Sequence, residues 1–133
     1  MKKTTLIFVA IVACLVSIAS AKSGVATFYT KYVPSACYGD KPQGNMVAAA
    51  SDVLWNNGAV CGKKYTIKCT GARNAVPFPC TGKSVTVKIV DHCPAGCAST
   101  IDLSKEAFTH IADPVAGIIN IDYKKAKDHD HDL

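Results

Sequence analysis

Alternating apolar and polar side chains predict two short β-strands in the middle of the chain. In residues 63–69, KKYTIKC, apolar side chains alternate with lysine and threonine, and residues 84–90, SVTVKIV, repeat the pattern. A period of two is typical of strands that bury one face. The same parity places Asp91 on the apolar side at the end of the second strand, where a carboxylate needs a hydrogen-bonding partner or a function.

Three further segments are predicted to be strands, and one segment a helix. Residues 24–30 and 117–123 are rich in β-branched and aromatic side chains, and residues 47–50 are a short run of small apolar residues. Residues 105–112, KEAFTHIA, have an apolar helical stripe and are preceded by Ser104, a suitable N-cap. A proline soon after this segment ends the helix.

A second, shorter helical turn is predicted over residues 52–56, with Ser51 as its cap and Trp55 as a core residue or, less favoured, a ligand platform. Short strands, long loops and little helix are typical of an all-β fold with small α content. We therefore expect a small β-barrel rather than a βαβ fold.

The first 21 residues have the pattern of a secretory signal peptide. Lys2 and Lys3 precede an almost unbroken apolar run over residues 6–18, and Ala-Ser-Ala at residues 19–21 is a small-x-small cleavage site. The apolar run is shorter than the roughly 20 residues that a spanning helix needs. A cleaved leader is therefore favoured over a membrane anchor, and the mature protein is expected to be secreted and not membrane-spanning.

The rest of the chain divides into a folded domain, residues 22–124, and a tail, residues 125–133. The tail consists of lysine followed by alternating aspartate and histidine, and carries no docking side chain before its last residue. Such a composition predicts disorder.

Six cysteines remain after the leader, an even number typical of a disulfide framework in a small secreted domain. Six cysteines allow 15 pairings, and the sequence alone does not select one. A local bridge from Cys69 to Cys80 would fasten the loop between them. Zinc is disfavoured because the folded region has neither Cys-x-x-Cys pairs nor a histidine pair at ligand spacing. We expect no metal and no cofactor.

The charge of the chain is mildly basic. Without Lys2 and Lys3, 13 basic residues face 10 acidic ones, a net charge of +3. The lysines are scattered, Arg73 is the single arginine, and no basic stripe typical of nucleic-acid binding is present. A solvated surface is the favoured interpretation, with weak attraction to an acidic polysaccharide or a membrane surface as the alternative.

Candidate chemistry is concentrated in residues 84–103, SVTVKIVDHCPAGCASTIDL. Asp91 ends a strand, and Asp102 lies two residues before the helix cap. Each has a structural alternative, because Asp91 could accept backbone N–H bonds from the following turn and Asp102 could be only a helix-start signal. The functional interpretation is a pair of polar groups at the rim of a groove.

Several motifs occur together in one order: GVATFYT, WNNGAVCGKKYTIKC, VTVKIVDHCPAGC, TIDLSKEAFTHIA and GIINIDY. They resemble the first domain of expansins, which is shared with family 45 endoglucanases and barwin-type proteins. YVPSACYGD, MVAAASDVLWNNGAVCG and VDHCPAGCASTIDLS are most similar to plant natriuretic peptide-like proteins, secreted expansin-like proteins with an endoglucanase-45-like domain. The resemblance covers residues 23–124 and implies a six-stranded double-psi β-barrel.

The resemblance also implies a disulfide pairing and a set of groove residues. The implied bridges are Cys37–Cys61 and Cys69–Cys80, which leaves Cys93–Cys97. In the related hydrolases the aspartate at the position of Asp102 is the general acid, and expansins retain it. Asp91 matches a second groove aspartate. Thr27 and Tyr29 match groove residues of the first strand.

The catalytic pair of the hydrolases is incomplete in this chain. Their general base would fall near Thr30 or Lys31, where no carboxylate occurs. Inverting glycoside hydrolysis needs two carboxylates, one to protonate the leaving group and one to activate water. We therefore expect no ordinary cellulase activity and assign no catalytic residue.

The resemblance implies a secreted apoplastic signalling protein that affects water and ion balance of plant cells, with the active segment within residues 33–66. The alternatives are a protein that binds or loosens wall polysaccharide through the groove without hydrolysis, and a barwin-like defence protein that binds microbial glycan. The expected partner is accordingly a cell-surface receptor or a wall polysaccharide, and the protein is expected to be a monomer.

Overall fold

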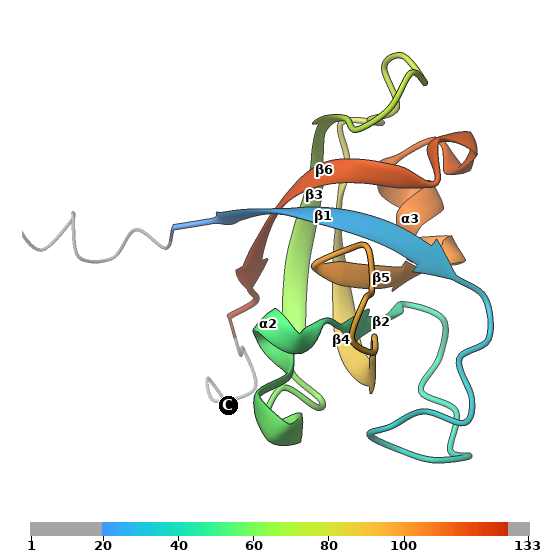
Figure 1. Ribbon diagram of the computed structural model, residues 1–133, viewed down its shortest axis with the longest axis vertical. Coiled ribbons are helices and arrows are strands. Elements are labelled where there is room, and N and C mark those ends of the chain that lie inside the picture. Colours follow the sequence, from blue (N-terminus) through green and yellow to red (C-terminus); the bar gives the residue numbers. More distant parts are fainter. Residues whose placement is uncertain (1–19, 128–133) are drawn as a thin grey trace, which may run out of the picture.

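The computed structural model describes residues 20–127, and most of the predicted leader and of the predicted tail lie outside these residues. Six strands close into a barrel in the order β1-β5-β2-β4-β3-β6. The pairs β1/β5 and β2/β4 are parallel, and the other four are antiparallel. The expected double-psi β-barrel is confirmed (Figure 1). The strands are β1 Lys22–Tyr29, β2 Val47–Ala50, β3 Lys64–Ala72, β4 Ser84–His92, β5 Ile101–Ser104 and β6 Ile118–Lys125.

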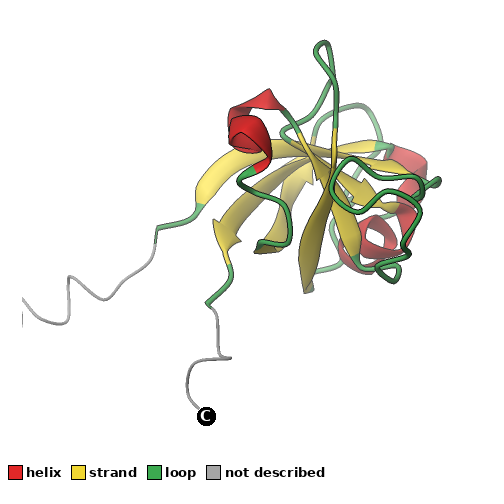
Figure 2. Cartoon of the chain, turned by 90° about the horizontal axis from the view of Figure 1, so that it is seen from below, coloured by secondary structure: helices red, strands yellow, loops and turns green. Residues whose placement is uncertain are grey.

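Two short α-helices lie on opposite sides of the strands (Figure 2). They are α2, Asp52–Trp55, which continues into the 3-10 turn Asn56–Gly58, and α3, Lys105–Ile111. Ser104 caps α3 as predicted, because its hydroxyl accepts a hydrogen bond from the Ala107 N–H at 3.1 Å. Ser51 occupies the N-cap position of α2 as predicted, but its side chain makes no capping hydrogen bond.

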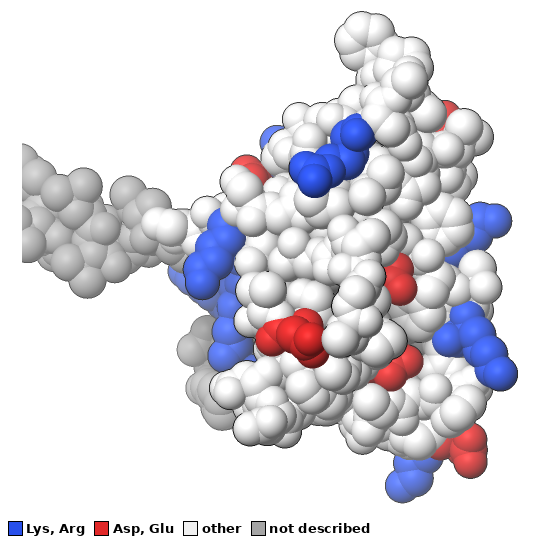
Figure 3. Space-filling model, in the orientation of Figure 1, with Lys and Arg blue, Asp and Glu red and all other residues white. Residues whose placement is uncertain are grey.

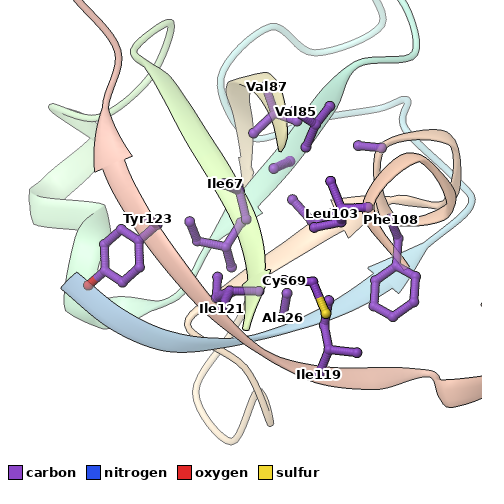
Figure 4. Packing of buried hydrophobic residues seen from close by; sticks show 14 of the residues in the cluster. Ala26, Ile67, Cys69, Val85, Val87, Leu103, Phe108, Ile119, Ile121 and Tyr123 are labelled. Carbon is purple, nitrogen blue, oxygen red and sulfur yellow. The ribbon is translucent and has the colours of Figure 1, made fainter. Parts of the chain in front are cut away.

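The inward side chains of the strands form one core, as the alternation predicts. Phe108 of α3 is fully buried at one end of the cluster and packs against Phe28 with ring centroids 5.1 Å apart. Tyr123 lies at the other end (Figure 4). The interior of the barrel is therefore packed with side chains.

One strand was not predicted. Residues Ile101–Ser104 were interpreted as the approach to the helix, whereas they form β5 between β1 and β2. Four residues are too few to show a clear alternation, and the capping pattern that follows dominates the local signal. Asp102 is therefore a strand residue, and its interpretation as a helix-start signal is wrong.

The predicted orientation of Asp91 is also wrong. The register of β2 against β4 shifts between Ala48, opposite Ile89, and Ala49, opposite Asp91. One extra residue, Val90, thus stands on the β4 side, and an extra residue reverses the alternation beyond it. Asp91 consequently points outward, like its partner Ala49, and not toward the core, like Ile89.

Three disulfides fasten the loops to this barrel: Cys37–Cys61, Cys69–Cys80 and Cys93–Cys97. This is the pairing that the resemblance implies. The Cys69–Cys80 bridge spans 11 residues and holds the β3–β4 loop near α3, where the Thr81 N–H also donates to the Ile111 carbonyl at 2.9 Å. The Cys93–Cys97 bridge spans only 4 residues.

Replacing Cys69 and Cys80 together by alanine is expected to lower the free energy of unfolding by about 3 kcal/mol, because the loop-closure entropy of the unfolded chain is restored. The matched Cys93→Ala/Cys97→Ala variant lacks a bridge that closes a shorter loop, so its free energy of unfolding is expected to fall by only about 2 kcal/mol. Urea denaturation of both variants measures the difference. An equal or larger loss for the second pair would contradict this account.

Candidate functional site

A row of outward-facing residues crosses four adjacent strands of the barrel wall. Thr27 of β1 stands opposite Asp102 of β5, Asp102 opposite Ala49 of β2, and Ala49 opposite Asp91 of β4. We call these residues, together with Tyr29 two positions along β1, the polar row. With adjacent strands about 4.8 Å apart, the Cα atoms of Asp91 and Asp102 lie roughly 10 Å apart. The small methyl group of Ala49 leaves the space between the two carboxylates open.

Asp102 is a partly buried carboxylate of the row. Its Oδ1 accepts a hydrogen bond from the Thr27 hydroxyl at 2.9 Å, and the Thr27 hydroxyl also lies 2.8 Å from the Ser99 hydroxyl. Burial raises the pKa of the Asp102 carboxyl, and the nearby negative charge of Asp91 raises it further, while the Thr27 bond acts in the opposite direction. Asp102 therefore holds a proton to higher pH than an ordinary aspartate.

Asp91 serves the structure as well as the row. Its Oδ1 accepts hydrogen bonds from the backbone N–H groups of Ala36 at 2.9 Å and of His92 at 2.8 Å. The first of these bonds ties the β1–β2 loop to the end of β4. The structural role that the sequence offered as an alternative is thus present, and it fixes the position of the carboxylate.

Tyr29 presents an unpaired hydroxyl. This oxygen is buried and has no hydrogen-bond partner among the described residues. The ring packs edge to face against Tyr32, with centroids 5.2 Å apart. Burial, followed by the charges of Asp91 and Asp102, raises the pKa of the Tyr29 hydroxyl well above its ordinary value. The hydroxyl stays protonated, and a buried donor without a partner costs stability unless a ligand or water completes it.

A second polar cluster, which the sequence analysis missed, stands at the end of the row. The rings of Trp55 and His92 stack with centroids 4.4 Å apart and planes 9° apart. His92 Nε2 lies 2.7 Å from Asp52 Oδ1. Trp55 is half-buried and packs against the core, which favours the predicted structural role. Only the position of His92 directly after Asp91 could have indicated this cluster.

A surface hollow of about 260 Å³ continues from the row beneath the Cys93–Cys97 loop. Ser99, which contacts Thr27, lies on its wall, together with Ser51 and Asp52. The Ser51 hydroxyl is buried and is the second side-chain oxygen without a partner among residues 20–127. Hydroxyl and carboxylate groups around open space are suited to the hydroxyl groups of a sugar.

The charges on this side of the molecule are unevenly distributed. In Figure 3 acidic side chains stand toward the middle of the visible face, and most lysine and arginine side chains stand toward its margins. Within the described part of the chain, no three His, Cys, Asp or Glu side chains are placed to hold a metal ion. No helix in that part is long and apolar enough to cross a membrane.

Comparison with known proteins assigns the chain to a family. The family model described as lytic transglycolase, DPBB_1, matches residues 47–123. The EG45-like domain containing protein 1 of Arabidopsis thaliana is 63% identical over 123 residues, which cover 92% of this chain and 98% of that protein. The chain belongs to the EG45-like family of double-psi β-barrel proteins.

Expansins are related to this EG45-like chain over part of their length. Expansin-B4 of Arabidopsis thaliana is 40% identical over 92 residues, which cover 61% of this chain and 34% of the expansin. An expansin of Clavibacter michiganensis, crystallised in complex with cellohexaose, superimposes with a TM-score of 0.63 at 28% identity. The match covers 82% of this chain and 52% of the bacterial protein. The predicted relation to expansins is therefore confirmed.

Replacing Thr27 by valine is expected to raise the pKa of the Asp102 carboxyl further, because the substitution removes a hydrogen bond that favours the ionised form. Carboxyl carbon chemical shifts measured by NMR across the acidic range report this pKa directly. Thr66→Val, which removes an exposed Thr66–Thr86 contact on another wall, is the matched control and should leave the Asp102 titration unchanged. A lower or unaltered pKa in the Thr27 variant would refute the assigned role of the hydroxyl.

Proposed function

We propose that this protein binds an uncharged, chain-like cell-wall polysaccharide along the polar row without hydrolysing it. The observation that carries the proposal is the unpaired Tyr29 hydroxyl beside Asp102, which is covered in the free protein and which a sugar oxygen would satisfy once the covering side chains move aside. An uncharged chain is favoured because the row itself carries the carboxylates of Asp91 and Asp102, which would repel an acidic polymer. The cellohexaose complex of the related bacterial expansin is consistent with this ligand class.

The proposal excludes ordinary inverting hydrolysis on chemical grounds. The raised pKa of Asp102 suits a proton donor, but such hydrolysis also needs a carboxylate that activates water. Thr30 and Lys31, where the related hydrolases place that base, are exposed residues without a carboxylate. Asp91 is a poor substitute, because its Oδ1 already accepts two backbone N–H bonds.

We further infer that the chain is secreted and acts in the apoplast. The leader-like pattern of residues 1–21 supports this inference. The three disulfides support it independently, because such bonds form and persist in oxidising compartments.

Titration of the protein with cellohexaose, followed by NMR, tests the proposed function. Resonances of Thr27, Tyr29 and Asp102 are expected to shift, and Tyr29→Phe should weaken binding by about threefold to tenfold through the loss of one hydrogen bond. Tyr65→Phe, on the opposite wall, is the matched control and should bind normally. Absence of binding, or release of shorter sugars during the titration, would overturn the proposal.

Signalling of the plant natriuretic peptide type is the second candidate. It is favoured by the fixed, largely exposed loop that precedes β2, which the Cys37–Cys61 bridge joins to the segment after α2. Both parts lie within residues 33–66, the segment that the resemblance implies to be active. A rigid exposed loop suits a receptor, because less conformational entropy is lost on binding.

Wall-free plant protoplasts separate the two candidates, because they offer no wall polysaccharide. Under the signalling hypothesis the protein is expected to change protoplast volume, and Asp102→Asn is expected to act equally, since Asp102 lies outside the implied active segment. The reduced and alkylated protein is the control that should lose the effect. Unchanged volume would remove this candidate and leave polysaccharide binding.

A further inference from the structure

The barrel wall opposite the polar row is basic. In the closed strand order, β3 and β6 stand across the barrel from β5 and β2. Lys64 and Lys68 of β3 and Lys124 of β6 stand at outward positions. Lys22 and Lys125 have the opposite parity, in register with Tyr123 and Tyr65, and are exposed at the adjoining strand ends. We call these lysines, which are far apart in the sequence, the lysine face: Lys22, Lys64, Lys68, Lys124 and Lys125. The interpretation of the lysines as scattered is therefore correct for the sequence but not for the fold.

The lysine face is not neutralised by carboxylates of the described residues. The one side-chain ion pair within residues 20–127 joins His92 and Asp52 on the other side of the barrel. Asp122 is the acidic residue on this face, where it stands opposite Lys68 in register and accepts a 3.4 Å hydrogen bond from the Ser23 hydroxyl. Clustered like charges on a sheet oppose folding, so stability does not explain this arrangement.

The surface between these lysines is hollowed. One hollow of about 290 Å³ is lined by Lys22, Lys125, Tyr65 and others, and a second of about 260 Å³ by Lys68, Thr66 and others. The two hollows adjoin, because Tyr123 and Lys124 line both. Lysine, hydroxyl-bearing and tyrosine side chains thus line two adjoining hollows, in which Asp122 is the one acidic lining residue among the described residues.

We propose that the lysine face is a second polysaccharide site, which binds a polyuronate, an acidic polysaccharide with one carboxylate on each sugar. The lysine ammonium groups pair with successive carboxylates, and the hydroxyl groups of Thr66 and Ser84 bind sugar hydroxyls. This site is separate from the polar row and takes the opposite class of ligand. The protein would then bridge a neutral and an acidic polymer of the wall.

The composition of the face favours a polyuronate over other polyanions. Every cation on it is a lysine, whereas phosphate recognition commonly uses the bidentate guanidinium of arginine. Insertion into a membrane requires exposed apolar side chains. The large apolar residues that the described structure exposes stand elsewhere: Val33, Met46, Val53, Phe78 and Val115.

Binding of the purified protein to de-esterified polygalacturonate tests the proposal. The binding is measured by affinity electrophoresis at several salt concentrations. Lys68→Gln/Lys124→Gln is expected to weaken binding roughly tenfold. Lys31→Gln/Lys41→Gln removes the same charge from exposed positions outside the face and should change binding less than about twofold. Fully methyl-esterified polygalacturonate, which lacks the carboxylates, should not bind.

Several outcomes would overturn the proposal. They are equal weakening by both lysine pairs, which would indicate net charge alone; equal binding of the methyl-esterified polymer; and tighter binding to DNA or to phosphatidylserine vesicles. Cellohexaose binding by Lys68→Gln/Lys124→Gln is measured in parallel and should match the unsubstituted protein. Failure at the lysine face is thereby distinguished from failure at the polar row.

Discussion

The fold depends on a short strand of small residues that must be buried on both sides. All four residues of β2, Val47–Ala50, are buried, and the strand pairs with β4 on one side and β5 on the other. Ala48 and Ala50 belong to the core, whereas Ala49 belongs to the polar row. A larger side chain at Ala49 would fill the space between Asp91 and Asp102. The same strand therefore closes the barrel and keeps the candidate site open.

The parts of the fold that local sequence could predict are those set by alternation and capping. The core side chains of β3 and β4, the cap at Ser104 and the approximate position of β6 follow from neighbours within a few residues. The even number of cysteines after the predicted leader indicated a disulfide framework. The pairing, however, was supplied by the resemblance and not by a physical derivation. The resemblance likewise supplied the double-psi barrel architecture, whereas the order of the strands was not predicted.

The parts that could not be predicted depend on pairing between distant strands. The extra residue at Val90 is visible only against β2, and it alone decides which side of the wall Asp91 occupies. β5 is identified as a strand by its partners β1 and β2, since four residues carry little signal of their own. The lysine face arises in the same way, because β3, β6 and the start of β1 meet only after the barrel closes.

The raised pKa of the Asp102 carboxyl links the polar row to the stability of the barrel. Its folded-state pKa is raised, so between the unfolded and folded pKa values the native state binds more protons than the unfolded state. Stability therefore falls as pH rises through that window, and at neutral pH the ionised carboxylate lowers the stability of the barrel. The Thr27 hydrogen bond lowers the pKa of Asp102 and so reduces this loss of stability, but burial, which raises the pKa, has the larger influence. The carboxylate of Asp102 thus costs stability at neutral pH, which accords with the proposal that the polar row binds a polysaccharide.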